Sequence, residues 1–364
     1  MKTLMEGNEA LAEAAVRAGC RAYFGYPITP QTQVVEYLAK RMPEVGGVCL
    51  QAESEVASIN MVYGAASAGA RVMTTSSSPG ISLMAECISY LVGSELPALI
   101  VNVMRAGPGL GGILPSQADY LQATRGGGHG GYRTLVLAPC SVQECADVMK
   151  LGFDKADEYR NPVFILADGL LGQMMEPVEL PDMAEAGAVD KPWATTGMHG
   201  RKKPNIINSL NTAADQLEAH NVHLNEKFAT MARNEVRSEM LGDDEPDILV
   251  IAYGSVARIS HSAVDRARAQ GLKVGLLRPI TLWPYPYKAV EKAAARAKAV
   301  LVVEMNNGQM VDDVRLSIHD RLPVRFFGRQ GGNVPSVREI YDQIMVLSTE
   351  MNASGQEVPV HAHA

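Results

Sequence analysis

Cysteine is scarce in this sequence, and its spacing suits neither an iron–sulfur cluster nor a disulfide framework. The five cysteines include no Cys-x-x-Cys pair, and no further cysteine follows the closest two, Cys140 and Cys145. A plant-type cluster needs additional cysteines at close spacing, and a disulfide framework normally uses an even set. The sequence therefore predicts ordinary buried thiols and no metal site in this chain.

Long apolar runs and concentrated positive charge are also lacking. No segment approaches the roughly 18 consecutive apolar residues of a membrane span, and the N-terminus is acidic where a signal peptide is apolar. The formal net charge is -7, and Lys and Arg form no dense run. These absences argue against insertion in a membrane and against binding of nucleic acid, and they predict a cytoplasmic protein.

The first half of the chain has an α/β pattern. Its 364 residues, 47% of them hydrophobic, are enough for two or three domains. Apolar runs of strand length alternate with segments of helix length, which is typical of a parallel sheet covered on both faces. We expect strands at 22–24, 72–75, 98–104, 134–138 and 163–167, and helices at 9–18, 31–41, 55–68, 81–92 and 142–159. The last helix follows Ser141 as N-cap, with Glu144 placed as in a capping box.

The second half divides into an irregular segment and a smaller α/β domain. The expected divisions are a first domain at 1–185, a linker or interaction arm at 186–244, a second doubly wound domain at 245–350 and a mobile tail at 351–364. The arm is rich in Pro, Lys, Asn and His, with a possible long polar helix within 210–237. The tail's two histidines, His361 and His363, are expected to be solvated rather than bound to metal.

A rigid turn, Gly-Tyr-Pro-Ile-Thr-Pro at residues 25–30, follows the first predicted strand. Its two prolines restrict the backbone, and Pro30 suits the first position of a helix with Thr29 as N-cap. That arrangement would put the Thr29 hydroxyl at the carboxyl edge of the sheet, where α/β folds bind ligands. A plain capped turn without a ligand is the alternative.

Glu55 is the leading candidate for a proton-sharing group. It opens a helix whose residues are mostly small or apolar, so the helix is expected to be buried. A carboxylate there lies in a low dielectric, which favours sharing of a proton. Glu53 is a weaker rival, and a simple interaction with the helix dipole is the alternative role.

Two further segments carry polar groups to the ends of predicted strands. Thr-Thr-Ser-Ser-Ser-Pro-Gly at residues 74–80 leads into a helix that begins near Ser78 and Pro79, and its hydroxyl and N–H groups can face a ligand. Arg105 directly follows the most apolar strand, where its guanidinium suits a carboxylate. Capping of a loop is the alternative role for the serine-rich segment.

Two glycine-rich segments are not expected to bind a nucleotide. Residues 107–112 fit the pattern G-x-G-x-x-G, but Pro115 prevents the helix that a dinucleotide site needs, and the preceding strand does not open a βαβ unit. Residues 126–131 are too rich in glycine for a regular element. We expect them to form a flexible loop that orders when substrate binds.

Together these motifs resemble the α subunit of 2-oxoacid:ferredoxin oxidoreductases. The resemblance is nearest to the branched-chain, 2-oxoisovalerate type, in which Gln-Ala-Glu-Ser-Glu, a serine run before Pro-Gly and Ala-Thr-Arg-Gly-Gly-Gly-His-Gly recur, although Thr75 here replaces the first serine. It continues through Ser-Gln-Ala-Asp-Tyr at 116–120, Ala-Asp-Gly at 167–169 and Val-Glu-Met-Asn-Asn-Gly-Gln-Met at 303–310. It implies an N-terminal pyrimidine-binding domain and a C-terminal domain like that of transketolase.

The resemblance implies roles for particular residues. Glu55 matches the glutamate that hydrogen-bonds N1′ of the aminopyrimidine of thiamine diphosphate, and Tyr26, Ser78 and Pro79 are expected to contact that cofactor. Thr29 and Arg105 match the residues that hold the carboxylate and carbonyl of the 2-oxoacid, and Tyr26 lines the same pocket. The implied reaction is oxidative decarboxylation with coenzyme A, which yields acyl-CoA, CO2 and reduced ferredoxin.

The family's diphosphate grip is absent from this chain. Ala167, Asp168 and Gly169 stand where Gly-Asp-Gly would be needed, and no asparagine follows at the family's distance. The resemblance therefore implies a β subunit that holds Mg²⁺ and the diphosphate, a γ subunit, and a small ferredoxin-like subunit that carries the iron–sulfur clusters.

Other functions remain as alternatives. A 2-oxoglutarate:ferredoxin oxidoreductase would use the same motifs, and a β subunit of a 2-oxoacid dehydrogenase E1 joins similar domains but passes its acyl group to lipoyl-lysine. A non-catalytic scaffold is the alternative from another class, and the presence of Thr29, Glu55 and Arg105 together argues against it.

Overall fold

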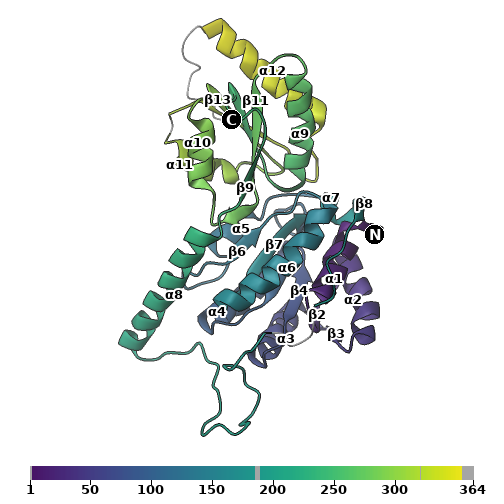
Figure 1. Ribbon diagram of the computed structural model, residues 1–364, viewed down its shortest axis with the longest axis vertical. Coiled ribbons are helices and arrows are strands. Elements are labelled where there is room, and N and C mark those ends of the chain that lie inside the picture. Colours follow the sequence, from purple (N-terminus) through teal and green to yellow (C-terminus); the bar gives the residue numbers. More distant parts are fainter. Residues whose placement is uncertain (1, 185–188, 320, 355–364) are drawn as a thin grey trace.

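A computed structural model describes residues 2–184, 189–319 and 321–354 of the chain. The first domain contains a seven-stranded sheet in the order β12-β6-β7-β5-β4-β2-β3 (Figure 1). Its strands are β2 (Ala22–Gly25), β3 (Val48–Gln51), β4 (Val72–Ser76), β5 (Leu99–Met104), β6 (Leu135–Leu137), β7 (Val163–Asp168) and β12 (Thr281–Trp283). All neighbours are parallel except β12 and β6. The predicted α/β class is confirmed.

Helices cover both faces of this sheet. They are α1 (Gly7–Arg17), α2 (Thr32–Glu44), α3 (Glu55–Ser67), α4 (Pro79–Gly93), α5 (Tyr120–Arg125), α6 (Val142–Tyr159) and α7 (Gly169–Gln173). Helix α1 packs between α2 and α6 on one face, and α3 packs against α4 on the other (Figure 1). Every residue of β5 and β7 is buried as a result. This explains why these strands are apolar apart from Asn102 and Asp168 and show no polar alternation. The short strands β1 (Thr3–Glu6) and β8 (Met175–Val178) pair separately.

The order of the strands creates a topological switch point between β2 and β4. From β2 the chain passes to β3 on one side, and then returns across β2 to β4 and β5 on the other side. The segments that follow β3, β2, β4 and β5 therefore leave the same edge of the sheet from four adjacent strands. Ligands of open α/β sheets bind at such an edge.

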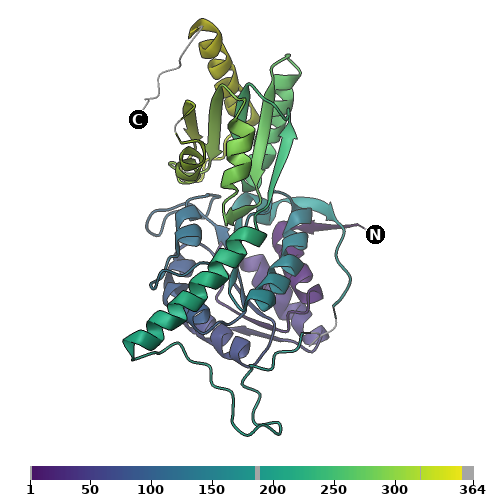
Figure 2. The same cartoon turned by 60° about the vertical axis from the view of Figure 1, so that its left-hand side comes forward.

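The second domain is a five-stranded sheet in the order β14-β13-β10-β11-β9 (Figure 2). Its strands are β9 (Ser238–Gly242), β10 (Ile248–Ile251), β11 (Val274–Pro279), β13 (Ala299–Glu304) and β14 (Val324–Gly328). Its helices are α9 (Gly254–Arg268), α10 (Tyr287–Ala294), α11 (Met310–Ile318) and α12 (Val337–Ser354). Strand β9 comes from the segment expected to be an arm, and pairs antiparallel with β11. Of the expected tail, residues 351–354 belong to α12, and the rest, with His361 and His363, lies outside the described residues.

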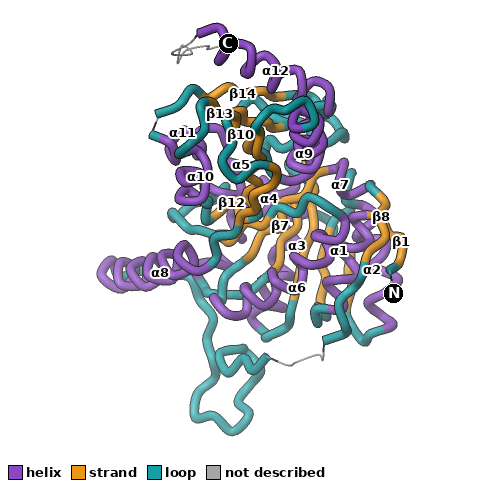
Figure 3. The backbone as a smooth tube through the Cα atoms, turned by 45° about the horizontal axis from the view of Figure 1, so that its top comes forward, coloured by secondary structure: helices purple, strands orange, loops and turns teal. Residues whose placement is uncertain are grey.

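The predicted polar helix of the arm is present as α8 (Ala214–Asn234). Its first residues are exposed and project from the first domain (Figure 3). Further along, Leu224, Phe228 and Met231 are buried, and Lys227 pairs with Glu95 at 3.2 Å. Helix α8 is therefore attached to the first domain along one stripe of its surface. No helix in the described parts of the chain is long and apolar enough to cross a membrane.

Arg278, at the end of β11, joins the two domains. Its guanidinium donates to both carboxylate oxygens of Glu144 on α6, at 2.8 and 2.7 Å, and to Glu239 on β9 at 2.7 Å. Ser141 caps α6 as predicted, because its hydroxyl accepts from the Glu144 N–H. The reciprocal bond of the expected capping box differs, since the Glu144 carboxylate accepts from the N–H of Cys140 and not from that of Ser141. The Glu144 carboxylate is turned toward Arg278, which accounts for the missing bond from the Ser141 N–H.

Replacing Arg278 by Met should destabilise the protein. The Arg278 side chain is 3% exposed, whereas the carboxylates of Glu144 and Glu239 keep contact with solvent. We therefore expect a loss of about 2 kcal/mol in the free energy of unfolding, between the values typical of exposed and of buried pairs. Denaturant unfolding of the purified protein measures this loss. Arg338→Met, which removes an exposed pair with Asp342, serves as control and should change stability by under about 0.5 kcal/mol. Equal effects of the two substitutions would contradict the prediction.

Candidate functional site

The four motifs meet at the carboxyl edge of the first sheet. The turn at 26–31 follows β2, the segment leading to Glu55 follows β3, the serine-rich turn follows β4, and Arg105 follows β5. Because these strands are adjacent, segments up to 80 residues apart in the sequence come together. The structure thus brings Tyr26, Thr29, Glu55 and Arg105 to one edge of the sheet.

Glu55 is a buried carboxylate without a partner in the described residues. It is the first residue of α3 and is 6% exposed, and no hydrogen bond or ion pair reaches its carboxylate from the described part of the chain. The helix itself is capped independently, because the Ser54 hydroxyl accepts from the Ala57 N–H at 3.2 Å. Both carboxylate oxygens are therefore available to a donor from outside this chain.

Gly80 and Ser76 lie beside the Glu55 carboxylate. A Cβ on Gly80 would lie 2.7 Å from Glu55 Oε1 and 2.0 Å from Ser76 Oγ, so only glycine leaves room there. The hydroxyls of Ser76 and Ser77 are buried and have no hydrogen-bond partner. Unsatisfied polar groups of this kind are rare in native interiors. Glu53, the rival candidate, has an exposed side chain.

Arg105 lies beside Thr29. Its guanidinium donates from Nη1 to the Thr29 carbonyl at 3.1 Å and from Nη2 to the Leu110 carbonyl at 3.2 Å. The side chain is 8% exposed, and its Nε–H is buried without a partner. Arg105 therefore carries a buried positive charge that no carboxylate of the described residues neutralises.

The predicted capping role of Thr29 is wrong. Helix α2 begins at Thr32 with Gln31 as N-cap, so Pro30 is not its first residue. The Gln31 N–H donates to the Ile28 carbonyl at 3.0 Å, which closes a turn over residues 28–31 and leaves Pro30 inside it. The Thr29 side chain is exposed at the sheet edge, as is that of Tyr26. Thr29 keeps its expected place at the edge but does not cap the helix.

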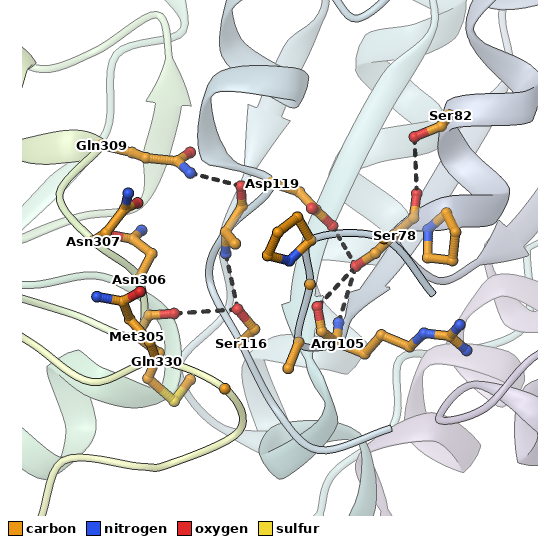
Figure 4. A pocket seen from close by; sticks show the side chains of 17 residues that line it. Ser78, Ser82, Arg105, Ser116, Asp119, Met305, Asn306, Asn307, Gln309 and Gln330 are labelled. Atoms are coloured by element: carbon orange, nitrogen blue, oxygen red, sulfur yellow. Dashed lines mark hydrogen bonds between the residues drawn. The ribbon is translucent and has the colours of Figure 1, made fainter. Parts of the chain in front are cut away.

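Ser78 links β4, β5 and a cleft between the two domains. Its N–H donates to Asn102 at 3.0 Å. Its hydroxyl donates to Asp119 at 2.6 Å (Figure 4). Pro79 follows as the first residue of α4. The cleft has a volume of about 610 Å³. The side chains that line it come from the first domain (Ser78, Pro79 and Arg105) and from the second (Met305, Asn306 and Gln309).

Asn102 and Asp119 were not among the residues that the sequence singled out as functional. Asn102 lies within an apolar strand, and Asp119 lies in an irregular segment before α5. Only the stretch around Asp119 carried a signal, because it formed part of the family resemblance. Their proximity to Ser78 depends on the pairing of β4 with β5.

The glycine-rich segments and Asp168 offer no diphosphate site in the described chain. Residues 107–112 form a loop, no helix begins directly after them, and residues 126–131 are also irregular. Asp168 caps α7 by accepting from Leu170 and Leu171, and its second oxygen accepts from Ser255 at 2.6 Å. Both of its carboxylate oxygens are therefore occupied within the chain.

Three of the five cysteines, Cys20, Cys87 and Cys145, are buried as predicted, whereas Cys49 and Cys140 are only partly buried. All five cysteines are free, and burial raises the pKa of Cys20 to about 12. Among the described residues, no three His, Cys, Asp or Glu side chains gather as a metal site would require.

Comparison with known proteins identifies the family. Residues 13–242 match the domain described as pyruvate flavodoxin/ferredoxin oxidoreductase, thiamine diphosphate-binding, and residues 246–340 match pyruvate:ferredoxin oxidoreductase core domain II. The chain belongs to this family of 2-oxoacid oxidoreductases, and the predicted resemblance is confirmed. Its first domain is the thiamine diphosphate-binding domain of that family.

Two relatives match nearly the whole length of the chain. The chain is 49% identical to ketoisovalerate oxidoreductase subunit VorB of Methanothermobacter marburgensis, over 96% of this chain and 99% of that protein. It is 35% identical to 2-oxoglutarate synthase subunit KorA of the same organism, over 94% of this chain and 98% of that protein. Both relatives are named as subunits.

Solved structures share the fold. The 2-oxoglutarate:ferredoxin oxidoreductase from Magnetococcus marinus, with 2-oxoglutarate, coenzyme A and succinyl-CoA bound, superposes with a TM-score of 0.84 and 28% identity. The match covers 95% of this chain and 65% of that one. A split-gene transketolase, at 13% identity and a TM-score of 0.57, shares the fold alone. The predicted transketolase-like architecture is therefore confirmed.

Replacing Gly80 by Ala should disturb the pocket of Glu55. The added methyl group would collide with Ser76 and Glu55, so we expect a loss of about 2 kcal/mol in the free energy of unfolding. Gly64→Ala is the matched control, because Gly64 lies within α3 with open space where its Cβ would go and Ala favours a helix by about 0.5–1 kcal/mol. Thermal unfolding of both variants measures the difference. Similar stability of the two would show that the Gly80 site has spare room.

Proposed function

We propose that this chain is the α subunit of a thiamine diphosphate-dependent 2-oxoacid:ferredoxin oxidoreductase. The reaction is the oxidative decarboxylation of a 2-oxoacid with coenzyme A to acyl-CoA, CO2 and reduced ferredoxin. The observation that carries the proposal is the buried, unpartnered carboxylate of Glu55 at the carboxyl edge of a sheet in a thiamine diphosphate-binding domain. Such a carboxylate suits a ligand that offers a ring nitrogen able to hold a proton.

The residues around Glu55 fit the aminopyrimidine of the cofactor. Gly80 leaves space beside the carboxylate, and Ser76 and Ser77 add hydroxyls without partners. Glu55 would hold a proton at N1′ of the pyrimidine, while Tyr26, Ser78 and Pro79 border the ring. When bound, thiamine diphosphate supplies the nucleophilic carbon and the electron sink that decarboxylation of a 2-oxoacid requires.

Arg105 and Thr29 suit the substrate's carboxylate and carbonyl. The Arg105 guanidinium is buried, carries a free Nε–H and is already fixed by two carbonyl groups. A carboxylate would supply the negative charge that this site lacks. Thr29, whose side chain is exposed, lies next to the Arg105 guanidinium, because its carbonyl accepts a hydrogen bond from Arg105. Tyr26 lies in the same turn and would line the pocket.

The site on this chain is half of a complete site. Asp168 is committed to α7 and Ser255, so a β subunit would supply Mg²⁺ and the grip on the diphosphate. Apolar side chains on β3, α3 and α4 are exposed, with Leu50 at 43%, Val56 at 47% and Leu83 at 55%. A partner subunit that covers them would also exclude water from Glu55.

Further partners complete the assembly. A small ferredoxin-like subunit would carry the iron–sulfur clusters and pass electrons to ferredoxin, and a γ subunit would complete a cytoplasmic complex. The naming of the relatives as subunits of oxidoreductases supports this division of labour.

Glu55→Gln should abolish decarboxylation in the reconstituted complex. The amide keeps the shape of the side chain but cannot stabilise a proton at N1′, so we expect kcat to fall by about 10²–10⁴-fold. Release of CO2 and reduction of ferredoxin are the measurements. Glu53→Gln, which alters an exposed side chain two residues away, should retain full turnover. Unchanged turnover in Glu55→Gln would reject the assigned role.

A panel of 2-oxoacids should show a preference for the branched-chain substrate. The higher identity to the ketoisovalerate enzyme than to the 2-oxoglutarate enzyme supports 2-oxoisovalerate. We expect kcat/KM for 2-oxoisovalerate to exceed that for 2-oxoglutarate by more than about 10²-fold, because a pocket built for an apolar chain leaves a second carboxylate unpaired. Pyruvate and an aryl 2-oxoacid complete the panel. Equal values for 2-oxoglutarate would indicate the related 2-oxoglutarate activity, and dependence on a lipoyl carrier would indicate an E1-type enzyme.

A further inference from the structure

Asp119 is a partly buried carboxylate at the wall of the cleft, and its hydrogen bonds come from neutral groups. Its Oδ2 accepts from the Ser78 hydroxyl at 2.6 Å (Figure 4). The same oxygen accepts from the Asn102 amide at 2.9 Å. No cation among the described residues pairs with it. Burial raises the pKa of this carboxyl, and the bonds from Ser78 and Asn102 oppose that rise. Asp119 thus has a defined position without belonging to an ion pair.

Ser78 connects Asp119 to the backbone of Arg105. Its hydroxyl, which donates to Asp119, also accepts from the Arg105 N–H at 3.0 Å. Ser78 adopts φ 24°, a conformation that residues other than glycine rarely adopt, and its N–H is held by Asn102. Ser78 therefore donates to Asp119 and to Asn102, and these two bonds help to maintain an unfavourable backbone conformation that aligns its hydroxyl with the Arg105 N–H.

The segment that carries Asp119 is attached to the second domain. The Gln117 N–H donates to the Met305 carbonyl at 2.9 Å, and its side-chain amide donates to the Tyr253 carbonyl at 2.9 Å. The side chain of Gln309 in turn donates to the Ala118 carbonyl at 2.7 Å. These bonds hold the residues directly before Asp119, so the second domain determines where its carboxylate lies.

We propose that Asp119 is a positioning residue that acts on Arg105 through Ser78. The second domain fixes Asp119, Asp119 holds the Ser78 hydroxyl, and Ser78 holds the Arg105 backbone from which the guanidinium extends. This inference rests on the proposed role of Arg105 in binding the substrate's carboxylate. Glu55 is positioned separately, because α3 has its own cap in Ser54. Loss of Asp119 should therefore weaken substrate binding more than it slows the chemical step.

The test compares Asp119→Ala, Asp119→Asn and Ser78→Ala in the reconstituted complex. We expect Asp119→Ala to raise the KM for the 2-oxoacid by about tenfold with kcat within about twofold, as for loss of binding common to ground and transition states. Ser78→Ala should raise this KM by a similar factor. Asp119→Asn keeps an acceptor in place and should restore KM to within about threefold of the wild type. The double variant should be no worse than the more severe single variant, because both act along one path.

Several outcomes would overturn the inference. A wild-type KM in Ser78→Ala would contradict it. Because Ser78→Ala removes only one hydroxyl, it keeps the test possible if Asp119→Ala does not fold. If the KM of the double variant rose by the product of the two single-variant factors, Asp119 would act independently of Ser78. Asp157→Ala is the matched control: it removes a carboxylate that binds Arg71 at 2.7 Å, at the opposite edge of the same sheet. It should lower stability and leave KM unchanged, and an equal rise in KM there would indicate a general loss of structure.

The same experiment separates this inference from the proposed function. A wild-type complex that decarboxylates no 2-oxoacid would reject the proposed function itself. A wild-type complex that is active and depends on Glu55, but whose KM is unaffected by Asp119→Ala and Ser78→Ala, would reject only the positioning role.

Discussion

The buried carboxylate of Glu55 sets the main physical constraint on this structure. Glu55 is 6% exposed, and the described chain supplies no donor to it. The helix that it opens is not buried as predicted, because Val56, Asn60 and Gly64 lie on an exposed face of α3. A carboxylate without a partner in the chain is available to a donor that another molecule supplies. A bound cofactor would account for the space at Gly80 and for the hydroxyls of Ser76 and Ser77 that lack partners. A second subunit would account for the exposed apolar side chains on β3, α3 and α4.

The fold creates this constraint through the order of its strands. Parallel strands end at a common edge, and the return of the chain across β2 places the ends of β3, β2, β4 and β5 side by side. Each strand contributes one motif, so no local segment contains the site. Glu55 and Arg105 are also positioned independently. Glu55 depends on the cap of α3, whereas Arg105 depends on contacts with Thr29 and Ser78.

The second domain takes part in the architecture of the site. Its turn at Met305 and Gln309 contacts the segment that precedes α5, and Arg278 joins it to α6. Strand β12, which comes from the second half of the chain, completes the sheet of the first domain. The apolar core likewise extends from the first sheet to Tyr253 and Leu277. The two domains therefore share both core and hydrogen bonds.

Local patterns in the sequence determined the α/β class and most of the long elements, and only the tertiary structure decided how distant segments pair. The limits of α6, for example, follow from its amphipathic period and from the capping preference of Ser141. The motifs that carry Glu55, Thr29 and Arg105 were also visible, because strand ends, prolines and charged residues in apolar surroundings are local features. The family resemblance then gave these motifs a chemical meaning that local evidence alone left open.

Strands β3, β9 and β12, by contrast, are short, and their stability comes from neighbours far away in the sequence, so no local period marks them. Thr29 looked like a helix cap, but the turn closed by Ile28 and Gln31 delays the start of α2. Asp119 carried no local signal of its role, since that role exists only through Ser78 and the second domain. Contacts between segments distant in sequence decided these features, and single-sequence patterns report only contacts between near neighbours.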